Sequence, residues 1–404
     1  MGKVGTETTM QQILAEVRGI KTYTDIIANG ITTKNWRGLK KLIDDDLAPA
    51  QYPVGSQFYD SWFKDANTEI QAPWDVVHYS SLGDMFLKWH YAIPDGVPFD
   101  EPEAIYYAPS GGLAAGTYHI LIGSAYGTGW DTAKAIQFTL NSDMDEGDQL
   151  VINCGTNYAN DPTNGRTWNV YAAGSTTSKD TGTTSNGTSG TSLGTIGAVN
   201  AHRTNGQLNA ISRVVYGYGR WSQSAIRQYL NSTAAAGYWW AMQNGWDRPP
   251  AVAATLRGFL AGCTAEFLAI LDEVEVVTAL NTQEGFTVTT ETTMDRIFLP
   301  SFEEMYISPQ LADVEGEEWD YFKDLAEEAG LTGKFAQGGT YPILITYNAN
   351  STTVPVVVWL RSCYRGSADV AWYVTSSGGV HGTSACGAVR GCPACKIKKS
   401  TAAA

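Results

Sequence analysis

The chain has 404 residues, which is enough for two or three domains that each bury a hydrophobic core. Its formal net charge of −14 argues against a nucleic-acid ligand, because binding to phosphates requires clustered Lys and Arg. It contains 13 Trp and 21 Tyr but only 17% charged residues, a composition typical of loop-rich folds and of contact surfaces.

The N-terminal region is expected to be helical and to carry no export signal. The first residues, MGKVGTETTMQQ, lack the basic start and apolar run of a signal peptide, and no stretch has the apolar length that crosses a bilayer. An amphipathic helix is predicted by the spacing of Met10, Ile13, Leu14, Val17 and Ile20, and a second short helix is predicted over residues 36–47. The first helix would serve oligomerisation or docking, or else pack on its own domain.

From residue 52 to about residue 172 the pattern changes to short strands. Runs such as AIYYA, TYHILIG, AIQFTL, DQLVI and TWNVYAA are separated by Gly, Pro, Asn and Asp. This spacing predicts an antiparallel β-sandwich. Residues 174–194 are almost wholly Gly, Ser and Thr, which cannot form a packed core, so they predict a linker or a long exposed hairpin before a domain boundary.

Beyond residue 199 the sequence predicts helices followed by strands. Ser222 is a good N-cap for a short helix that ends at Asn231. A longer helix is predicted from Ala251 to about Asp272, where apolar residues recur every three or four positions. The segments DRIFLPS, YPILITY and VPVVVWL are typical of strands.

Five motifs in this half of the chain occur in a characteristic order. They are Trp-Ser-x-Ser-x-x-Arg-x-x-Leu-Asn from Trp221, Phe-Leu-Pro-Ser-x-x-Glu from Phe298, Trp-Leu-Arg-Ser from Trp359, Tyr-Val-x-x-x-Gly from Tyr373, and Val-Arg-x-x-Pro-Ala-Cys-x-Ile from Val389. On these motifs the region resembles the C-type-lectin-like domain, in the form shared by formylglycine-generating enzymes and by the variable proteins of diversity-generating retroelements. The resemblance implies a compact scaffold of two helices and a twisted sheet, with hypervariable residues near the C-terminus.

The resemblance to variable proteins also implies diversification at template adenines. Mutagenesis of the adenines in an AAC-type codon yields residues such as Tyr, His, Asp, Ser, Cys and Arg, but never Lys, Glu, Gln, Met or Trp. Between Ser362 and Arg390 none of those excluded residues occurs except Trp372. The run from Cys363 to Asp369 consists of chemically unrelated residues that one such codon can reach.

Apolar residues interleave with these positions in the manner of the inward face of a hairpin. They are Trp359, Leu360, Val370, Trp372, Val374, Val380 and Val389. The intervening residues are therefore expected to point outward and bind ligand: Cys363, Tyr364, Arg365, Ser367, Asp369, Tyr373, Thr375, Ser377, His381, Thr383, Ser384 and Cys386. An ordinary β-hairpin with a polar outer side would have the same composition.

Three arginines fall on motif positions rather than on variable ones. For Arg361, Arg390 and Arg227 we expect a role in the scaffold, such as pairing with Asp295 or Glu304.

Cysteines and carboxylates raise alternatives to simple binding. Cys392 and Cys395 have CxxC spacing and could form a disulfide or, with Cys363 and Cys386, a zinc site, although Cys395 falls on the Pro-Ala-Cys motif. Formylglycine-generating enzymes hold copper through a cysteine pair that Cys386 and Cys392 could mimic, but neither maps onto the enzymes' catalytic motif. Calcium could bind the acidic cluster at 315–320, where carboxylates also simply favour a helix N-terminus. We expect no cofactor, no metal and no catalysis.

The expected fold class is α+β. We divide the chain into an N-terminal helical segment for attachment or oligomerisation (1–48), an antiparallel β-sandwich that ends in the Gly/Ser/Thr-rich stretch (49–198), a C-type-lectin-like variable domain that binds ligand (199–397), and a tail (398–404).

The resemblance implies a ligand-binding display protein, diversified by a retroelement and carried on a phage tail without prior export or membrane insertion. Its expected partners are a host-surface protein or glycan, other virion proteins, and further copies of itself in a trimer. The alternatives are a structural virion protein of the head or baseplate, and a prophage-encoded ligand-binding protein at the bacterial surface.

Overall fold

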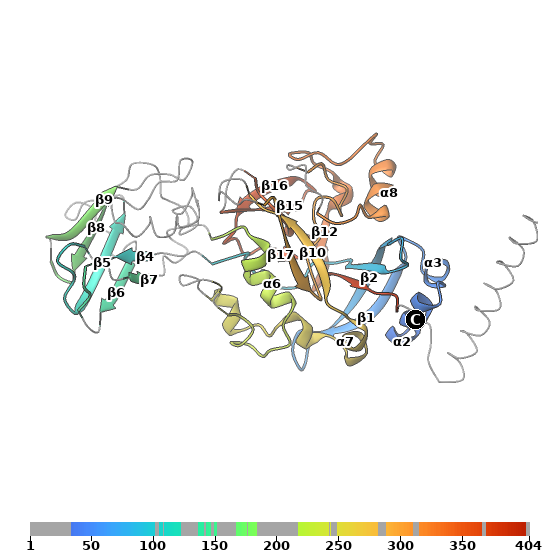
Figure 1. The fold of residues 1–404 in the computed structure, drawn as a ribbon, viewed down its shortest axis with the longest axis horizontal. Helices are drawn as coiled ribbons and strands as arrows, with labels where there is room; N and C mark the ends of the chain where they lie inside the picture. The colour runs from blue at the N-terminus through green and yellow to red at the C-terminus, as the bar shows by residue number, and fades with distance from the viewer. Residues whose placement is uncertain are drawn as a thin grey trace, which may run out of the picture.

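The computed structural model describes residues 34–101, 105–107, 109–122, 136–140, 143–146, 149–151, 167–175, 177–183, 217–241, 243, 249–281, 288–309, 315–365 and 369–400. Within these ranges helices accompany several mostly antiparallel sheets, so the chain is of mixed α+β class (Figure 1). The amphipathic helix predicted over residues 10–20 lies outside the described residues. No helix in the described ranges combines the length and the apolar character needed to span a bilayer.

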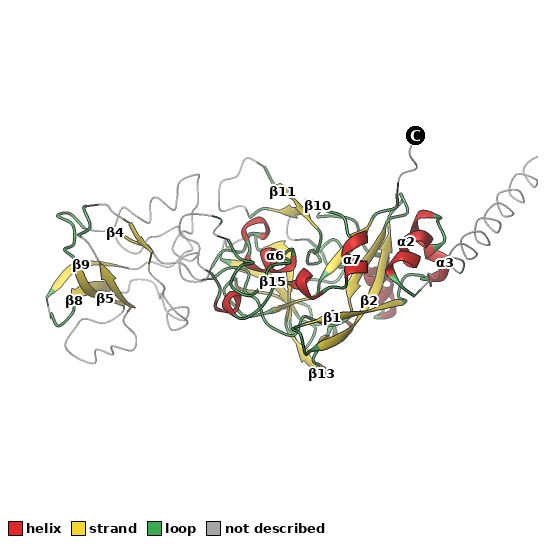
Figure 2. Cartoon of the chain, turned by 90° about the horizontal axis from the view of Figure 1, so that it is seen from below, coloured by secondary structure: helices red, strands yellow, loops and turns green. Residues whose placement is uncertain are grey.

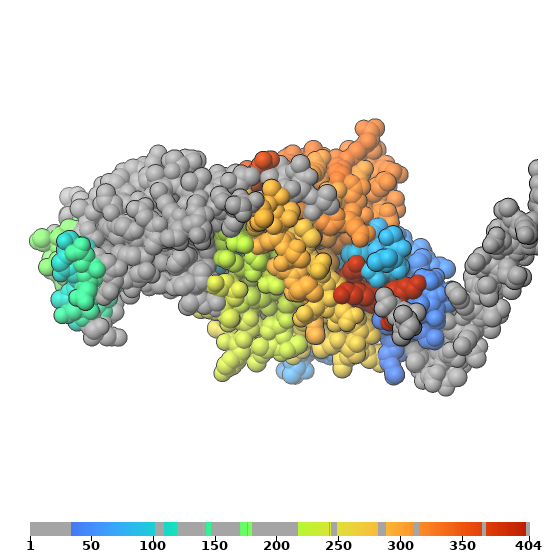
Figure 3. Space-filling model, in the orientation of Figure 1, coloured from blue at the N-terminus to red at the C-terminus, as the bar shows by residue number. Residues whose placement is uncertain are grey.

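One four-stranded sheet is built from both ends of the described chain. Its order is β1-β2-β3-β18, with β1 (Gln57–Phe63), β2 (Glu69–Tyr79), β3 (Met85–Trp89) and β18 (Ala394–Ile397). All neighbours are antiparallel, and Cys395 of β18 lies opposite Leu87 of β3. Figure 3 accordingly shows red C-terminal residues against blue N-terminal ones.

Helical segments cover both faces of this sheet. On one face lie α2 (Trp36–Asp44) and α7 (Ala265–Ile270), whose Trp36 and Phe267 rings have their centroids 6.2 Å and 5.2 Å from that of Trp74 in β2. On the other face lies Trp319, at the start of α8 (Asp320–Glu328). Its ring centroid is 6.1 Å from that of Phe86 in β3. Because both faces are covered, even the short strand β3 is buried along its whole length.

A second four-stranded sheet has the order β16-β15-β14-β17. It contains β14 (Val358–Cys363), β15 (Val370–Val374), β16 (Val380–Ser384) and β17 (Arg390–Gly391), and only the β14–β17 pair is parallel. Two hairpins flank it: β10 (Val274–Ala279) with β11 (Thr290–Asp295), and β12 (Thr346–Asn348) with β13 (Ser351–Val356). Buried apolar residues from Trp36 to Ile397 form one hydrophobic cluster, so both sheets share one core.

The strands between Asp100 and Gly217 pair only among themselves. One sheet has the order β6-β5-β8-β9, with β5 (Gly116–Ile122), β6 (Ile136–Leu140), β8 (Thr167–Ala172) and β9 (Ser178–Thr183), while β4 (Ile105–Tyr107) pairs with β7 (Gln149–Val151). Figures 1 and 2 draw these strands at one end of the molecule, and their buried residues Tyr118 and Val170 lie outside the shared core.

The two ends of this inserted segment lie against each other. Gly217 has a φ of 79°, and a Cβ atom placed on it would lie 2.5 Å from the carbonyl oxygen of Asp100. A side chain therefore does not fit at this contact, where the chain leaves the body and returns to it. We call residues 34–101 and 217–400 the body and residues 102–216 the inserted unit.

This arrangement differs from the division expected from sequence. The boundaries at 49–198 assign β1, β2 and β3 to the sandwich, whereas in the structure they share a sheet and a core with the C-terminal half. The reason is that alternating apolar residues mark a strand but not its partner, and β3 pairs with residues at the far end of the chain. Part of the Gly/Ser/Thr-rich stretch is a strand, because β9 forms a hairpin with β8.

The long helix predicted over residues 251–272 is broken into three pieces. They are the 3-10 turns η4 (Ala251–Ala254) and η5 (Phe259–Gly262), followed by α7. Gly258 has a non-helical backbone, with φ of −57° and ψ of 150°, and approaches Ser232 so closely that a Cβ atom would lie 2.2 Å from the Ser232 carbonyl oxygen. Thr264 then starts a new helix, because its hydroxyl accepts the Phe267 N–H at 3.3 Å.

The predicted helix after Trp221 forms, but it starts two residues later than expected. Its N-cap is Ser224, whose hydroxyl accepts the Arg227 N–H at 3.2 Å, and α6 runs over Ala225–Leu230. Ser222 instead donates its hydroxyl to Glu291 at 2.8 Å, so a tertiary contact replaces the predicted cap.

Candidate functional site

The residues expected to bind ligand lie on and around the three strands β14, β15 and β16. In the β15–β16 hairpin Tyr373 lies opposite His381 and Trp372 lies opposite Gly382. Because side chains alternate along a strand, Tyr373 and His381 share one face of the sheet and Trp372 and Gly382 share the other. The expected ligand-binding residues are therefore divided between two faces.

The turn between β15 and β16 depends on a glycine. Gly378 has a φ of 83°, and a Cβ atom on it would lie 2.0 Å from the carbonyl oxygen of Tyr341. The Tyr341 N–H in turn donates to the Gly378 carbonyl at 2.9 Å, which ties the hairpin to the preceding loop. The position of the hairpin is thus fixed by a backbone contact that only glycine permits.

Replacing Gly378 with alanine should destabilise the protein more than the same change at Gly338. Gly338 also has a positive φ, of 73°, but open space surrounds it, so Gly338→Ala should cost only the backbone strain of about 1–2 kcal/mol. Gly378→Ala adds the clash with Tyr341 and should cost about 1–3 kcal/mol more. Denaturant unfolding of both variants measures the difference, and equal losses would show that the close contact with Tyr341 is unimportant.

A row of rings crosses the first face from the core to the edge of the sheet. Trp359 of β14 is fully buried and donates its indole N–H to the Val97 carbonyl at 3.0 Å. Tyr373 is half-buried, and its ring centroid lies 6.3 Å from that of Trp359. His381 is exposed, and its ring centroid lies 6.5 Å from that of Tyr373. The outer end of this row can contact a partner, while its inner end is held by the core.

A second set of rings packs on the opposite face. The ring centroids of Tyr364 and Trp372 lie 4.8 Å apart, and those of Trp372 and Phe302 lie 4.9 Å apart. Gly382 lies under Tyr364, because a Cβ atom there would come within 2.6 Å of the tyrosine ring. Tyr364 is therefore partly a packing residue, and its half-exposed ring is held in one place.

The twelve residues expected to bind ligand fall into four groups. Exposed are Arg365, Ser377 and His381, and half-buried are Tyr364, Tyr373, Thr375, Thr383, Ser384 and Cys386. Cys363 and Asp369 are buried, with 7% and 6% of their surface exposed, and Ser367 lies outside the described residues.

The expectation that Cys363 and Asp369 point outward is thus wrong. Cys363 packs against Ala279 of β10, which lies beside the end of β14. Asp369 lies where the chain turns into β15, and its carbonyl oxygen accepts the Ala385 N–H at 2.8 Å. Alternation along the sequence does not reveal a neighbouring hairpin that covers one of the outward positions.

The expected arginine pairs are present below this surface. Only 1% of the Arg361 surface is exposed. Both of its terminal nitrogens donate hydrogen bonds to the Glu304 carboxylate, with Nη2 lying 2.8 Å from Oε1. Arg227 donates from Nε to Asp295 at 2.7 Å, which confirms the predicted use of Asp295 and Glu304 as partners. Arg390 instead donates to the Pro94 carbonyl at 3.1 Å.

Three of the cysteines considered for metal or copper binding have a raised thiol pKa. Burial raises the pKa of Cys386 to about 11, and the neighbouring Glu101 carboxylate adds to this shift. Burial likewise raises the pKa of Cys392 and Cys395 above the ordinary value. Among the described residues, no group of three or more His, Cys, Asp or Glu side chains could hold a metal ion. A nucleophilic thiol would need the opposite shift.

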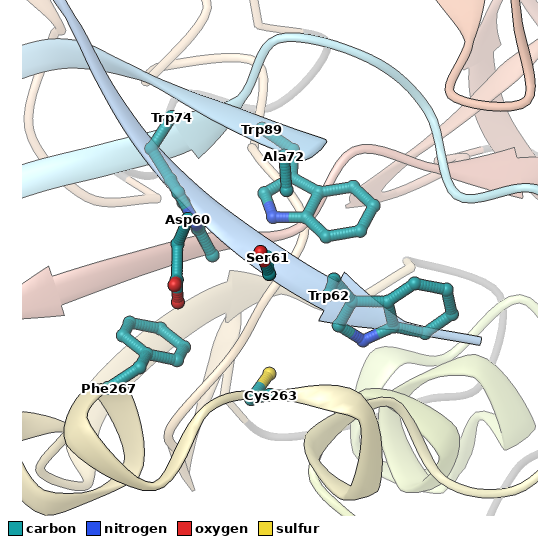
Figure 4. Close-up of a pocket in the computed structure, with 8 residues that line it drawn as sticks. All are labelled: Asp60, Ser61, Trp62, Ala72, Trp74, Trp89, Cys263 and Phe267. Carbon is teal, nitrogen blue, oxygen red and sulfur yellow. The ribbon is translucent and has the colours of Figure 1, made fainter. Parts of the chain in front are cut away.

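A small cavity lies on the other sheet, between β1, β2, β3 and the loop before α7. Figure 4 shows that Asp60, Trp74, Trp89 and Cys263 are among the side chains lining it. Its volume of about 10 Å³ is enough for roughly one water molecule, and the buried Trp89 Nε1 has no protein partner there. This cavity is too small for a cofactor or substrate, so the better candidate for ligand binding is the exposed surface of the β14–β16 sheet.

Comparisons with known proteins yield one family match. Residues 203–399 match a family described as a domain of unknown function, DUF6273. The matched range includes the whole β14–β16 sheet but leaves out β1, β2 and β3 of the body. No curated protein matches the chain, and no solved structure matches it.

Proposed function

We propose that the chain is a non-enzymatic display protein in which a C-type-lectin-like framework presents diversified residues to a ligand. The observation that carries the proposal is the gradation from Trp359 through Tyr373 to His381, in which a fixed interior ring supports a half-buried ring and an exposed one. A surface of this kind can exchange its outer side chains without losing its frame.

The chemistry of the exposed and half-buried groups suits reversible binding. Arg365, Tyr364 and Tyr373 offer the large, partly polar side chains that dominate binding energy at protein surfaces. Ser377 and Thr383 add short hydroxyl groups that can adapt to different acceptors and donors.

The proposed setting is the tail of a phage virion, where the chain recognises a protein or glycan on the host surface. Several copies, in our proposal a trimer, would raise a weak single-site affinity by avidity. The inserted unit, for which we propose a β-sandwich, would provide attachment to other virion proteins.

Resequencing the locus across a population tests diversification. Substitutions should concentrate at the codons of exposed and half-buried residues such as Arg365, Tyr373, His381 and Thr383, and should spare Arg361, Trp359 and Trp372. The side chains of Arg361, Trp359 and Trp372 are buried, so substitutions there would lower the stability rather than alter binding. An even spread of substitutions over the sheet would contradict the proposal.

Adsorption to host cells tests binding by the same surface. A virion with Arg365→Ala and His381→Ala should adsorb at least ~10-fold less well, while the purified variant keeps its unfolding midpoint, because both side chains are exposed. Tyr364→Ala is a poor probe, since its ring packs on Trp372. Unchanged adsorption would favour the structural virion role instead.

A further inference from the structure

A buried cluster of two carboxylates and one cation lies directly beneath the end of β14. Glu304, Glu315 and Arg361 expose 4%, 4% and 1% of their surface. They come from three segments: the turn after residue 300, the chain leading to α8, and β14. Arg361 is the one cation facing the two acids among the described residues, so the charges of the cluster do not balance when both acids are ionised.

Arg361 has no N–H to spare for the Glu315 carboxylate. Its Nη1 donates to the Leu299 carbonyl at 2.8 Å and to Glu304 Oε2, and Nη2 donates to Glu304 Oε1 at 2.8 Å. Nη2 also reaches the backbone carbonyl of Glu315 at 2.6 Å, and Nε lies 3.4 Å from the Val277 carbonyl. The guanidinium is thus saturated by one carboxylate and by backbone oxygens.

The Glu315 carboxyl group therefore has only neutral partners. Its Oε1 accepts the Ala279 N–H of β10 at 2.8 Å, and its Oε2 is hydrogen-bonded to the hydroxyl of Ser362. The Ser362 hydroxyl also accepts the Phe302 N–H at 2.9 Å. An isolated ionised carboxylate is costly to bury, and such a group relieves the cost by binding a proton.

We propose that Glu315 is a proton-binding site, and that the proton it holds stabilises the packing of residues 315–319 against β10 and the end of β14. Ser362 directly precedes Cys363, the last residue of β14, so the site lies at the end of this strand. The inference does not depend on what the surface of the β14–β16 sheet binds.

The direction of the pH effect follows from burial. Burial raises the pKa of Glu315 above its ordinary value, while Arg361 opposes the shift only in part and the charge of Glu304 adds to it. A folded-state pKa above the unfolded value of 4.5 means that the folded state binds the proton more tightly. The stabilisation is complete below that unfolded value and is lost as pH rises through the folded-state pKa.

Of the other charged groups around the cluster, Glu304 has the same direction of shift, because burial raises its pKa although its pair with Arg361 opposes the shift. A Glu304→Gln variant is therefore needed to separate the two acids. Glu317 is exposed and lies against His78 rather than inside the cluster. Elsewhere in the body, hydrogen bonds with His90 and Lys396 lower the pKa of Asp75 and of Asp84 respectively, so the stability that these carboxylates contribute is lost only as pH falls through values below about 3.8. Between pH 5 and pH 8 histidines such as His78 and His90 also change charge, so the contribution of Glu315 is the difference between the native chain and its Glu315→Gln variant.

The test compares denaturant unfolding of the full chain with that of Glu315→Gln across this range. For the native chain, the folding equilibrium constant should fall by up to ~10-fold per pH unit as pH rises from the unfolded-state pKa of Glu315 to its folded-state pKa. Glu315→Gln keeps the acceptor for Ala279 and removes the charge, so its profile should be flatter. Asp324→Asn is the matched control, because it removes one exposed carboxylate from α8 and should leave the slope unchanged.

Two results would overturn the proposal. One is an equal pH slope for the native chain and Glu315→Gln. The other is loss of the slope in Glu304→Gln alone, which would place the proton on Glu304. If Glu315→Gln does not fold, carboxyl carbon NMR of the native chain decides: the assigned Glu315 carboxyl should titrate above the ordinary glutamate value, and titration at or below that value would refute the site.

Discussion

Replacing Arg361 with methionine should lower the free energy of unfolding by about 3–5 kcal/mol, because the change leaves Glu304 buried without its cation. Methionine fills a similar volume, so the loss reports the missing charge and hydrogen bonds rather than a cavity. Arg361 also binds the carbonyl oxygens of Leu299 and Val277, which would lose their donors at the same time. Equilibrium denaturation in urea measures the effect.

A surface pair gives the control for this variant. Lys334 bridges Glu303 at 2.6 Å and Glu318 at 2.7 Å, but the Lys334 and Glu318 side chains are partly exposed. Lys334→Met should therefore cost no more than about 1 kcal/mol. If the two methionine variants lose the same stability, then the buried Arg361 contributes no more to the stability of the body than the partly exposed Lys334. A second check is Arg361→Met with Glu304→Leu, which should recover part of the loss.

Ending the chain after Pro393 should abolish cooperative folding of the body. The deletion removes β18, in which Ala394, Cys395 and Ile397 are all fully buried, and it strips β3 of its outer neighbour. The Phe298 and Ala394 backbones also exchange hydrogen bonds of 2.9 Å and 2.8 Å, which the truncated chain cannot make. Loss of the Ile397 side chain alone costs roughly 2–5 kcal/mol, and the lost pairing with β3 and the lost hydrogen bonds add to it, so the total becomes comparable with the stability of a domain.

Point variants in the same strand show whether pairing or mere length matters. Ile397→Ala should cost about 2–5 kcal/mol and still fold, because the strand remains. Lys398→Ala should have little effect, since its ammonium group makes only an exposed contact with the Glu273 carbonyl. A truncated chain that keeps the native unfolding midpoint would show that β1, β2 and β3 form a stable unit without the C-terminus.

Local features of the fold could be predicted from sequence because they depend on neighbouring residues. The helix at Trp36, the short helix before Asn231 and the strand at Trp359 all form as their apolar spacing indicates. The pairing of Arg361 with Glu304 was also predictable, because both residues lie in motifs and a buried arginine requires a carboxylate.

Long-range features could not be predicted in the same way. Nothing in the pattern of β3 shows that it pairs with β18, and nothing near Cys363 shows that Ala279 covers it. The break in the predicted helix at Gly258 likewise results from a contact with Ser232, which only the folded backbone reveals. Glu315 was expected to favour a helix start, but burial against β10 and β14 gives it a different environment.

The contact between Asp100 and Gly217 has a consequence for how such a molecule can change over time. The chain leaves the body and returns to it at this one contact. The length of the inserted unit can therefore vary without altering the register of any strand in the body. The size of the inserted unit and the packing of the body are then separate properties of one chain, and each can be modified while the other is retained.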